Sequence, residues 1–171
     1  MIQIQDIHSQ LESLLSTLSD EIENTAVSDS SISGWSVGQQ IYHVLIVLSG
    51  MAVALRREQD ATGGRSSNNY LDAILETGSI PRGHFVAPAA VQPSEQPSTT
   101  DLNRLLLKTR KRISGLLGLD PKSTVIHPIL GPIDRDESLR FMVIHTNHHQ
   151  AIIKDILVSA SERDANVNIP G

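Results

Sequence analysis

Apolar residues recur every three or four positions in four separate stretches of the chain, which is the pattern of amphipathic helices that pack around a common core. The stretches predict helices over about 5–22, 37–58, 102–117 and 135–161. The second stretch is apolar on nearly every side, so its helix should lie at the centre of the fold or against another subunit. No convincing run follows the two-residue period of a strand. The pattern therefore predicts a single all-α domain over residues 1–171.

Three cap sequences mark where predicted helices begin. Ser36 is followed three residues later by Gln39, which fits the capping box in which each side chain bonds the other residue's backbone N–H. The run 98–101 is cap-like, and Asp134 with Glu137 is placed to cap the last helix. These caps predict starts for three of the four helices.

The segment over about 61–97 is rich in glycine, serine and proline and has room for one short helix, over 70–76. A connection of this length is expected if the second and third helices run in the same direction, because the chain must then return along the whole bundle. Residues 120–132 are expected to form a loop that packs on the bundle end, and residues 162–171 an irregular tail. The prediction is a four-helix bundle with a long crossover between its second and third helices.

Three histidines occupy positions where a bundle helix normally carries leucine or isoleucine. His145 and His149 follow the same rotation as the apolar residues of the fourth helix, and His43 lies in the apolar second helix. Residues four apart on a helix have Cβ atoms about 6 Å apart, so two imidazoles can converge on one ion at metal–nitrogen distances of about 2 Å. All three histidines fall in the inner part of a bundle, so they can meet.

Three neutral imidazoles leave positions for water or substrate, which is the pattern of a catalytic zinc site rather than a structural one. The set also suits nickel, iron, manganese or copper, so the ligands do not identify the metal. The alternative is a hydrogen-bonded cluster of core histidines, because a single buried histidine is more commonly hydrogen-bonded than coordinated. We favour the metal site, because the pair lies on an apolar face and a third buried histidine comes from another helix.

Two further histidines compete for a place in the site. His148 fits the apolar rotation less well than His149, and we place it at the edge, as an outer donor or a surface residue. His127 precedes a proline in the loop before the fourth helix, where it could line the mouth of a pocket or fix the loop by a hydrogen bond. No acidic residue is clearly placed as a general base, since Glu137 is assigned to the helix cap and Asp155 lies off the face of His149.

Composition narrows the function further. The chain has no cysteine, which excludes thiolate ligands, disulfides and a cysteine nucleophile. Its 14 Lys and Arg against 19 Asp and Glu give a net charge of −5 without a strongly basic run, so nucleic acid is not expected as a partner. The amino terminus lacks a signal-peptide pattern, and the longest apolar run, 41–55, is shorter than the roughly 20 residues of a membrane span. A soluble cytoplasmic protein without a membrane partner is expected.

Several motifs resemble the DinB-like (damage-inducible protein) superfamily. The second-helix motif of that superfamily is similar to the run Gly34-Trp-Ser-Val-Gly-Gln-Gln-Ile-Tyr-His43. Its fourth-helix signature resembles His127-Pro-Ile-Leu-Gly-Pro-Ile-Asp134 followed by Arg140-Phe-Met-Val-Ile-His-Thr-Asn-His-His149. A crossover segment of some members resembles Pro81-Arg-Gly-His-Phe-Val-Ala-Pro88. These motifs span most of the chain, and the spacing of the three histidines is the most specific feature.

The resemblance implies an up-down-down-up bundle, often dimeric, that holds one divalent metal ion through His43, His145 and His149. Zinc or nickel is preferred for that ion, with manganese and iron as alternatives. Characterised members use the scaffold for thiol-dependent transfer or isomerisation, with mycothiol, bacillithiol or glutathione coordinated at the metal, and many other members have no known reaction.

From the residues and the resemblance together we expect a metal-dependent enzyme of the thiol S-transferase, isomerase or hydrolase type. It should act on a small-molecule substrate and form a homodimer, with a low-molecular-weight thiol as an optional further cofactor. The alternative is a non-enzymatic metal-binding or interaction bundle that retains the histidine site.

Overall fold

A computed structural model describes residues 4–57, 69–83 and 86–167 of the chain. The elements, with η denoting a 3-10 helix, are α1 (Ile4–Asp20), η1 (Ile22–Asn24), α2 (Val37–Arg57), α3 (Asn69–Thr77), η2 (Ala89–Val91), α4 (Thr99–Ser114), β1 (Thr124–His127), β2 (Gly131–Asp134) and α5 (Arg135–Val167). The described residues are mostly helical, as the all-α prediction requires, and they also include one short two-stranded sheet. Residues 58–68 and 84–85, which include the expected end of the second helix and parts of the expected crossover, lie outside this description, as do the last four residues of the expected tail.

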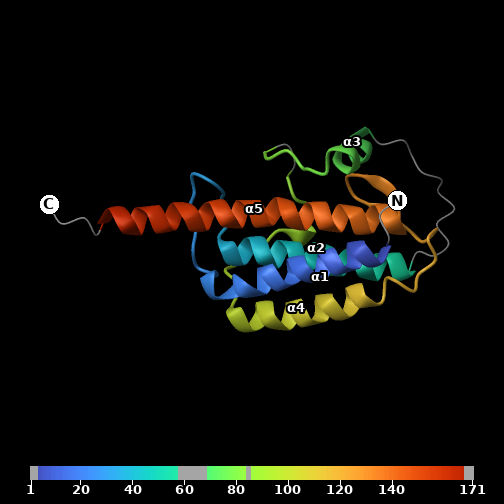
Figure 1. Cartoon of the computed structure of the whole chain (residues 1–171), viewed down its shortest axis with the longest axis horizontal. Helices are drawn as coiled ribbons and strands as arrows, with labels where there is room; N and C mark the ends of the chain where they lie inside the picture. The colour runs from blue at the N-terminus through green and yellow to red at the C-terminus, as the bar shows by residue number, and fades with distance from the viewer. Residues whose placement is uncertain (1–3, 58–68, 84–85, 168–171) are drawn as a thin grey trace.

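The four long helices α1, α2, α4 and α5 lie side by side along the long axis of the molecule (Figure 1). α2 contacts α4 and α5, and α1 contacts the same two helices. Their apolar stripes form one core, whose fully buried members include Leu11, Leu15, Leu45, Leu48, Leu102 and Ile156. At its C-terminal end α5 extends past the other three helices (Figure 1).

The run 41–55 is shorter than a membrane span, but the helix that contains it, α2, has 21 residues. Its length and hydropathy are those of a membrane span. However, 61% of its apolar segment is buried inside the fold. The helix packs against both α4 and α5, and a core helix of a soluble protein has the same composition. Packing within the protein therefore accounts for the apolar character of α2.

The predicted caps stand at the starts of their helices. The Gln39 backbone N–H donates to Ser36 Oγ at 3.2 Å, and the Ser36 N–H donates to Gln39 Oε1 at 3.0 Å. Asp134 and Glu137 form the same reciprocal pair in front of α5. The Ser98 hydroxyl accepts a backbone N–H at the start of α4. Local chemistry along the chain was therefore enough to place these helix starts.

The expected loop over 120–132 was only partly right, because it contains a β-hairpin that the sequence pattern did not predict. β1 pairs antiparallel with β2, with Thr124 opposite Asp134 and His127 opposite Gly131. The three residues between the strands turn tightly into Gly131, whose φ of 72° lies in the left-handed region that favours glycine. Four-residue strands beside prolines are too short to show a two-residue period. As expected, the segment packs on the helices, through the buried side chains of Val125, Leu130 and Ile133.

The expected irregular tail was wrong for its first part, because α5 continues to Val167. Asp29, in the connection between η1 and α2, anchors this extension. Its carboxylate accepts a hydrogen bond from the Ser159 hydroxyl at 2.6 Å and another from the Arg163 guanidinium, with which it also forms an ion pair. A contact between residues so far apart in the chain leaves no local signal in the sequence.

Gly38 and Gly50 provide a matched pair of test positions within α2. A Cβ on Gly38 would lie 2.9 Å from Thr25 Cβ and 3.0 Å from the Thr25 carbonyl oxygen, whereas a Cβ on Gly50 would meet nothing within 4 Å. We expect Gly38→Ala to destabilise the protein by about 1–3 kcal/mol, because the backbone at Thr25 must shift. Gly50→Ala should stabilise it by about 0.5–1 kcal/mol, because alanine is the better helix former. Urea unfolding measures both, and equal stabilities would contradict the close approach of α2 to Thr25.

Candidate metal centre

Three histidines from two helices meet inside the fold. His43 comes from α2, and His145 and His149 come from α5, which contacts α2. Their exposed fractions are 4%, 7% and 7%. Each offers a ring nitrogen, and these nitrogens all lie within 4.8 Å of one another. The structure thus brings together the three histidines that the sequence assigned to one site, and their role as metal ligands stays a prediction.

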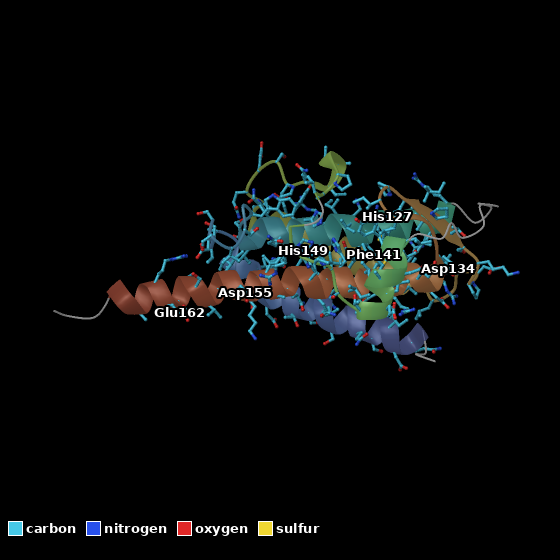
Figure 2. The ribbon with its side chains drawn as sticks, turned by 90° about the horizontal axis from the view of Figure 1, so that it is seen from above. His127, Asp134, Phe141, His149, Asp155 and Glu162 are labelled. Carbon is cyan, nitrogen blue, oxygen red and sulfur yellow. The ribbon has the colours of Figure 1, made fainter. Side chains whose placement is uncertain are left out.

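A row of residues four apart places the α5 histidines. Phe141, His145 and His149 follow one another at this spacing, and the ring of Phe141 lies 5.6 Å from that of His145, centroid to centroid. Figure 2 shows Phe141 and His149 on the same helix, with Asp155 farther toward the C-terminal end. The Asp155 carboxylate pairs instead with Arg82 at 2.7 Å. Asp155 therefore lies along the helix from the site rather than in it, as the sequence predicted.

The closest approach within the cluster has the spacing of two metal ligands. Nε2 of His43 lies 3.2 Å from Nε2 of His145, a contact that forms a hydrogen bond between the two rings in the metal-free protein. Two nitrogens that bind one ion at about 2.0–2.1 Å with tetrahedral angles lie about 3.3 Å apart. The ring centroid of His149 lies 4.7 Å from that of His43 and 4.6 Å from that of His145. The chemistry and spacing of the donors therefore fit one divalent transition metal ion.

Hydrogen bonds fix which nitrogen two of the histidines turn toward the cluster. Nδ1 of His43 donates to the Val91 carbonyl oxygen at 2.8 Å, and Nδ1 of His149 donates to Gln40 Oε1 at 2.6 Å. A neutral imidazole carries a single proton, so Nε2 of both residues keeps its lone pair. Histidines that bind metals usually hold their other nitrogen in this way.

The sequence did not identify Gln40 or Val91 as parts of the site. Gln40 is 1% exposed, and its amide also donates to the Ser33 hydroxyl at 2.9 Å, so the acceptor for His149 is itself held in place. The signal available for Gln40 was a polar residue three positions before His43 in an apolar helix, which puts both on one face. Val91 acts through its backbone carbonyl, so no side-chain pattern could have indicated it.

His145 differs from the other two histidines, because its Nδ1 is buried with no hydrogen-bond partner among the described residues. A buried polar atom left unpaired costs about 1–3 kcal/mol. In the metal-free fold His145 therefore pairs only one of its two ring nitrogens, through the 3.2 Å contact of Nε2 with His43. Residues that break a packing rule in this way are expected at functional sites.

Burial keeps the three imidazoles neutral near pH 7. It lowers the pKa of His43 below the ordinary value of 6.5 and holds the pKa values of His145 and His149 well below it. The neighbouring histidines lower the last two pKa values further, because positive charges on adjacent rings repel each other. Neutral imidazoles keep the lone pairs that a metal ion requires.

The three histidines line a cavity of about 620 Å³. This volume falls within the range of small-molecule sites. The Trp35 ring lies beside His43, with centroids 5.1 Å apart, and Phe141 flanks His145. The arrangement can hold an ion at the wall and a small molecule in the space beside it, and an ion with open positions acts as a Lewis acid.

His148 and His127 lie next to the cluster. The ring of His148 packs edge-on against His149, with centroids 5.0 Å apart, and its side chain bonds the backbone of Ile80. Nδ1 of His127 accepts two backbone N–H groups of the hairpin turn at 3.2 and 3.1 Å. Both side chains also line the cavity. His148 thus lies at the edge, as expected, and His127 combines its two expected roles, at the cavity wall and in fixing the loop.

The metal-free protein should lose stability at pH values between the pKa of His127 in the folded state and its pKa in the unfolded state. Burial lowers its pKa from 6.5 to about 4, so over this range the unfolded state binds a proton that the folded state does not. We expect the melting temperature to fall as the pH falls from 6.5 to about 4. His127→Asn should make the decline shallower, because the asparagine oxygen can accept the same N–H groups without titrating. An unchanged slope would contradict the buried, neutral state of His127.

A family model described as the DinB superfamily matches residues 3–153, a range that includes both helix segments with the clustered histidines. No curated protein and no solved structure matches the chain.

Proposed function

The chain belongs to the DinB superfamily, and we propose that it is a metal-dependent enzyme in which His43, His145 and His149 hold one divalent metal ion. The observation that carries this proposal is the convergence of three buried, neutral imidazoles at the wall of a cavity. Zinc or nickel is the preferred ion, with manganese and iron as alternatives, because imidazole nitrogen suits several of these metals.

The proposed chemistry is thiol S-transfer, isomerisation or hydrolysis. An ion on three histidines supplies Lewis acidity, which lowers the pKa of a bound water or thiol and polarises a carbonyl group. Val91 and Gln40 keep the protons of His43 and His149 on Nδ1 and so orient both rings. Two aromatic rings flank the cluster and form part of the cavity wall. No carboxylate of the described chain lines the cavity, so the proposed reactions are those that need no carboxylate as a base.

We also propose that α1, α2, α4 and α5 form an up-down-down-up four-helix bundle. The contacts of α2 with α4 and α5, and of α1 with the same two helices, support this arrangement. The long connection between α2 and α4, which contains α3 and η2, also supports it. Two consecutive helices that run in the same direction need such a crossover.

A non-enzymatic metal-binding protein is the second candidate, and the lack of a carboxylate among the described cavity residues favours it. Assays of thiol transfer and of ester hydrolysis, each with metal-loaded and chelated protein, distinguish the two. The enzyme predicts turnover that disappears on chelation and returns when the metal is restored. Stoichiometric metal without turnover in either reaction class would favour the non-enzymatic role.

The small-molecule substrate, the low-molecular-weight thiol, the homodimer and the cytoplasmic location stay predictions. Sedimentation equilibrium tests the homodimer directly. A mass twice that of the 18.6 kDa chain is expected, and the mass of a single chain at all concentrations would contradict it.

A further inference from the structure

The cavity beside the histidine cluster has no charged side chain in its described wall. Apart from histidines and Trp35, the one polar side chain among the described lining residues is that of Gln92, whose amide donates to the Ala87 carbonyl oxygen. The remaining lining side chains are apolar or belong to glycine. A ligand in this cavity would therefore meet mainly apolar surface, with the histidines, Trp35 and Gln92 as the polar exceptions among the described side chains.

The described rim of the cavity is apolar as well. Val86, Ile126 and Ile129 line the cavity and are 84%, 64% and 38% exposed. They are three of the seven large apolar side chains that the described part of the chain exposes. An apolar rim that leads into an apolar cavity favours the entry of an apolar molecule, because both surfaces lose contact with water when it binds.

In the metal-free protein, anionic ligands have no cationic partner among the described residues of the wall. Arg82, near His148, is not among the lining residues and pairs with Asp155 at 2.7 Å. The chain as a whole carries a net charge of −5, which also repels anions. Moving a carboxylate into apolar surroundings without a partner carries a large desolvation cost. A thiol with several carboxylates, such as glutathione, is therefore poorly matched to this cavity.

We propose that the cavity binds a neutral, mainly apolar molecule that reaches the histidine cluster through one sulfur or oxygen atom, and that it discriminates against anionic ligands. Contact through that atom rests on the proposed metal site, whereas the preference for a neutral, apolar body does not. A volume of about 620 Å³ can hold a ligand larger than a single ring.

The first test uses metal-free protein, so its result does not depend on metal binding. The probes are 1-octanol and octanoate, which have the same chain length and differ in charge. We expect 1-octanol to raise the melting temperature, and octanoate to need a concentration about tenfold higher or more for the same rise, because its carboxylate loses hydration. An equal or stronger effect of octanoate would overturn the proposal.

The second test uses zinc-loaded protein and calorimetric titration with 1-butanethiol, 3-mercaptopropionate and glutathione. With the sulfur on the ion, the carboxylates of the anionic thiols would lie in the apolar part of the cavity, so we expect 1-butanethiol to bind at least about tenfold more tightly than either of them. Tighter binding of glutathione would overturn the neutral-ligand proposal while leaving the metal site standing. Failure of the protein to retain zinc would instead contradict the proposed function, and the octanol comparison would still decide the ligand preference.

A charge introduced at the rim provides the matched variant. Val86→Arg places a cation at a position that is 84% exposed, so the fold should tolerate it. It should strengthen binding of 3-mercaptopropionate several-fold relative to binding of 1-butanethiol. Val158→Arg, at a position 49% exposed and outside this cavity, is the control and should change neither affinity. Equal effects of the two variants would contradict the location of the ligand.

Discussion

Replacing His145 with leucine is expected to abolish stoichiometric metal binding while the metal-free protein keeps its fold. Two remaining histidines cannot complete the three-nitrogen set. Leucine fills a similar volume in a position that is 7% exposed, and it removes the unpaired Nδ1. The substitution also removes the 3.2 Å contact with His43 Nε2, so the metal-free variant should stay folded with a free energy of unfolding within about 1–3 kcal/mol of that of the metal-free parent protein.

The effect of His145→Leu on the stability of the protein should be largest when metal is present. An ion at 100 times its dissociation constant stabilises the fold by about 2.7 kcal/mol, and His145→Leu should lose that stabilisation. Thermal unfolding with and without zinc, together with metal analysis of the dialysed variant, measures both quantities. If the cluster is only a hydrogen-bonded part of the core, the substitution will change stability without changing metal content.

His148→Leu is the matched control for this experiment. His148 lies on the same helix, lines the same cavity and touches His149, but it is not one of the three histidines whose nitrogens converge. The variant should retain the metal content of the parent protein and its stabilisation by zinc. Loss of the ion in this variant would mean that the ligand set was wrongly assigned.

Replacing Gln40 with leucine is expected to weaken metal binding by about 10–100-fold, the usual cost of losing a group that orients a metal ligand. Gln40 Oε1 accepts the Nδ1 proton of His149 at 2.6 Å, and without it that ring can rotate or change tautomer. Competition with a chelator of known affinity measures the change.

Gln40→Glu separates orientation of the ligand from a general effect on packing. Its carboxylate keeps an acceptor for His149, so metal affinity should stay within a few-fold of that of the parent protein. A structural role alone would lower the stability of Gln40→Leu in the absence of metal without changing its metal affinity. Unchanged affinity in Gln40→Leu would show that this hydrogen bond does not support the site.

The long helices were predictable because each carries its own signal. The residues that form the stripe of α1, such as Leu11 and Leu18, recur at helical spacing and are fully buried. The capping box of Ser36 and Gln39 depends only on residues three apart, and both of its hydrogen bonds are present. Features that depend on neighbours along the chain can be inferred without knowledge of the tertiary structure.

The candidate site was predictable to the level of residue type and helix face. Histidines are uncommon on fully apolar faces, and that contrast alone singled out His43, His145 and His149. Their mutual distances depend on how α2 packs against α5, which no local pattern specifies. The prediction therefore named three candidate ligands, and the structure supplied the 3.2 Å approach between two of their nitrogens.

Features that depend on distant contacts were missed. The Val91 carbonyl in the crossover accepts a hydrogen bond from His43. Asp29, before α2, accepts a hydrogen bond from Ser159 near the C-terminal end of α5. The hairpin before α5 is stabilised by pairing between two very short strands rather than by a long apolar repeat. In each case the interaction joins residues whose local sequences give no sign of the partner.

The metal content of the purified protein tests the central claim most directly. Elemental analysis of the dialysed chain should find one divalent transition metal ion per chain, and its removal by a chelator should lower the melting temperature. Protein that carries no stoichiometric metal, and whose melting temperature does not change when zinc, nickel or manganese is added, would contradict the metal site and the enzyme proposed on it.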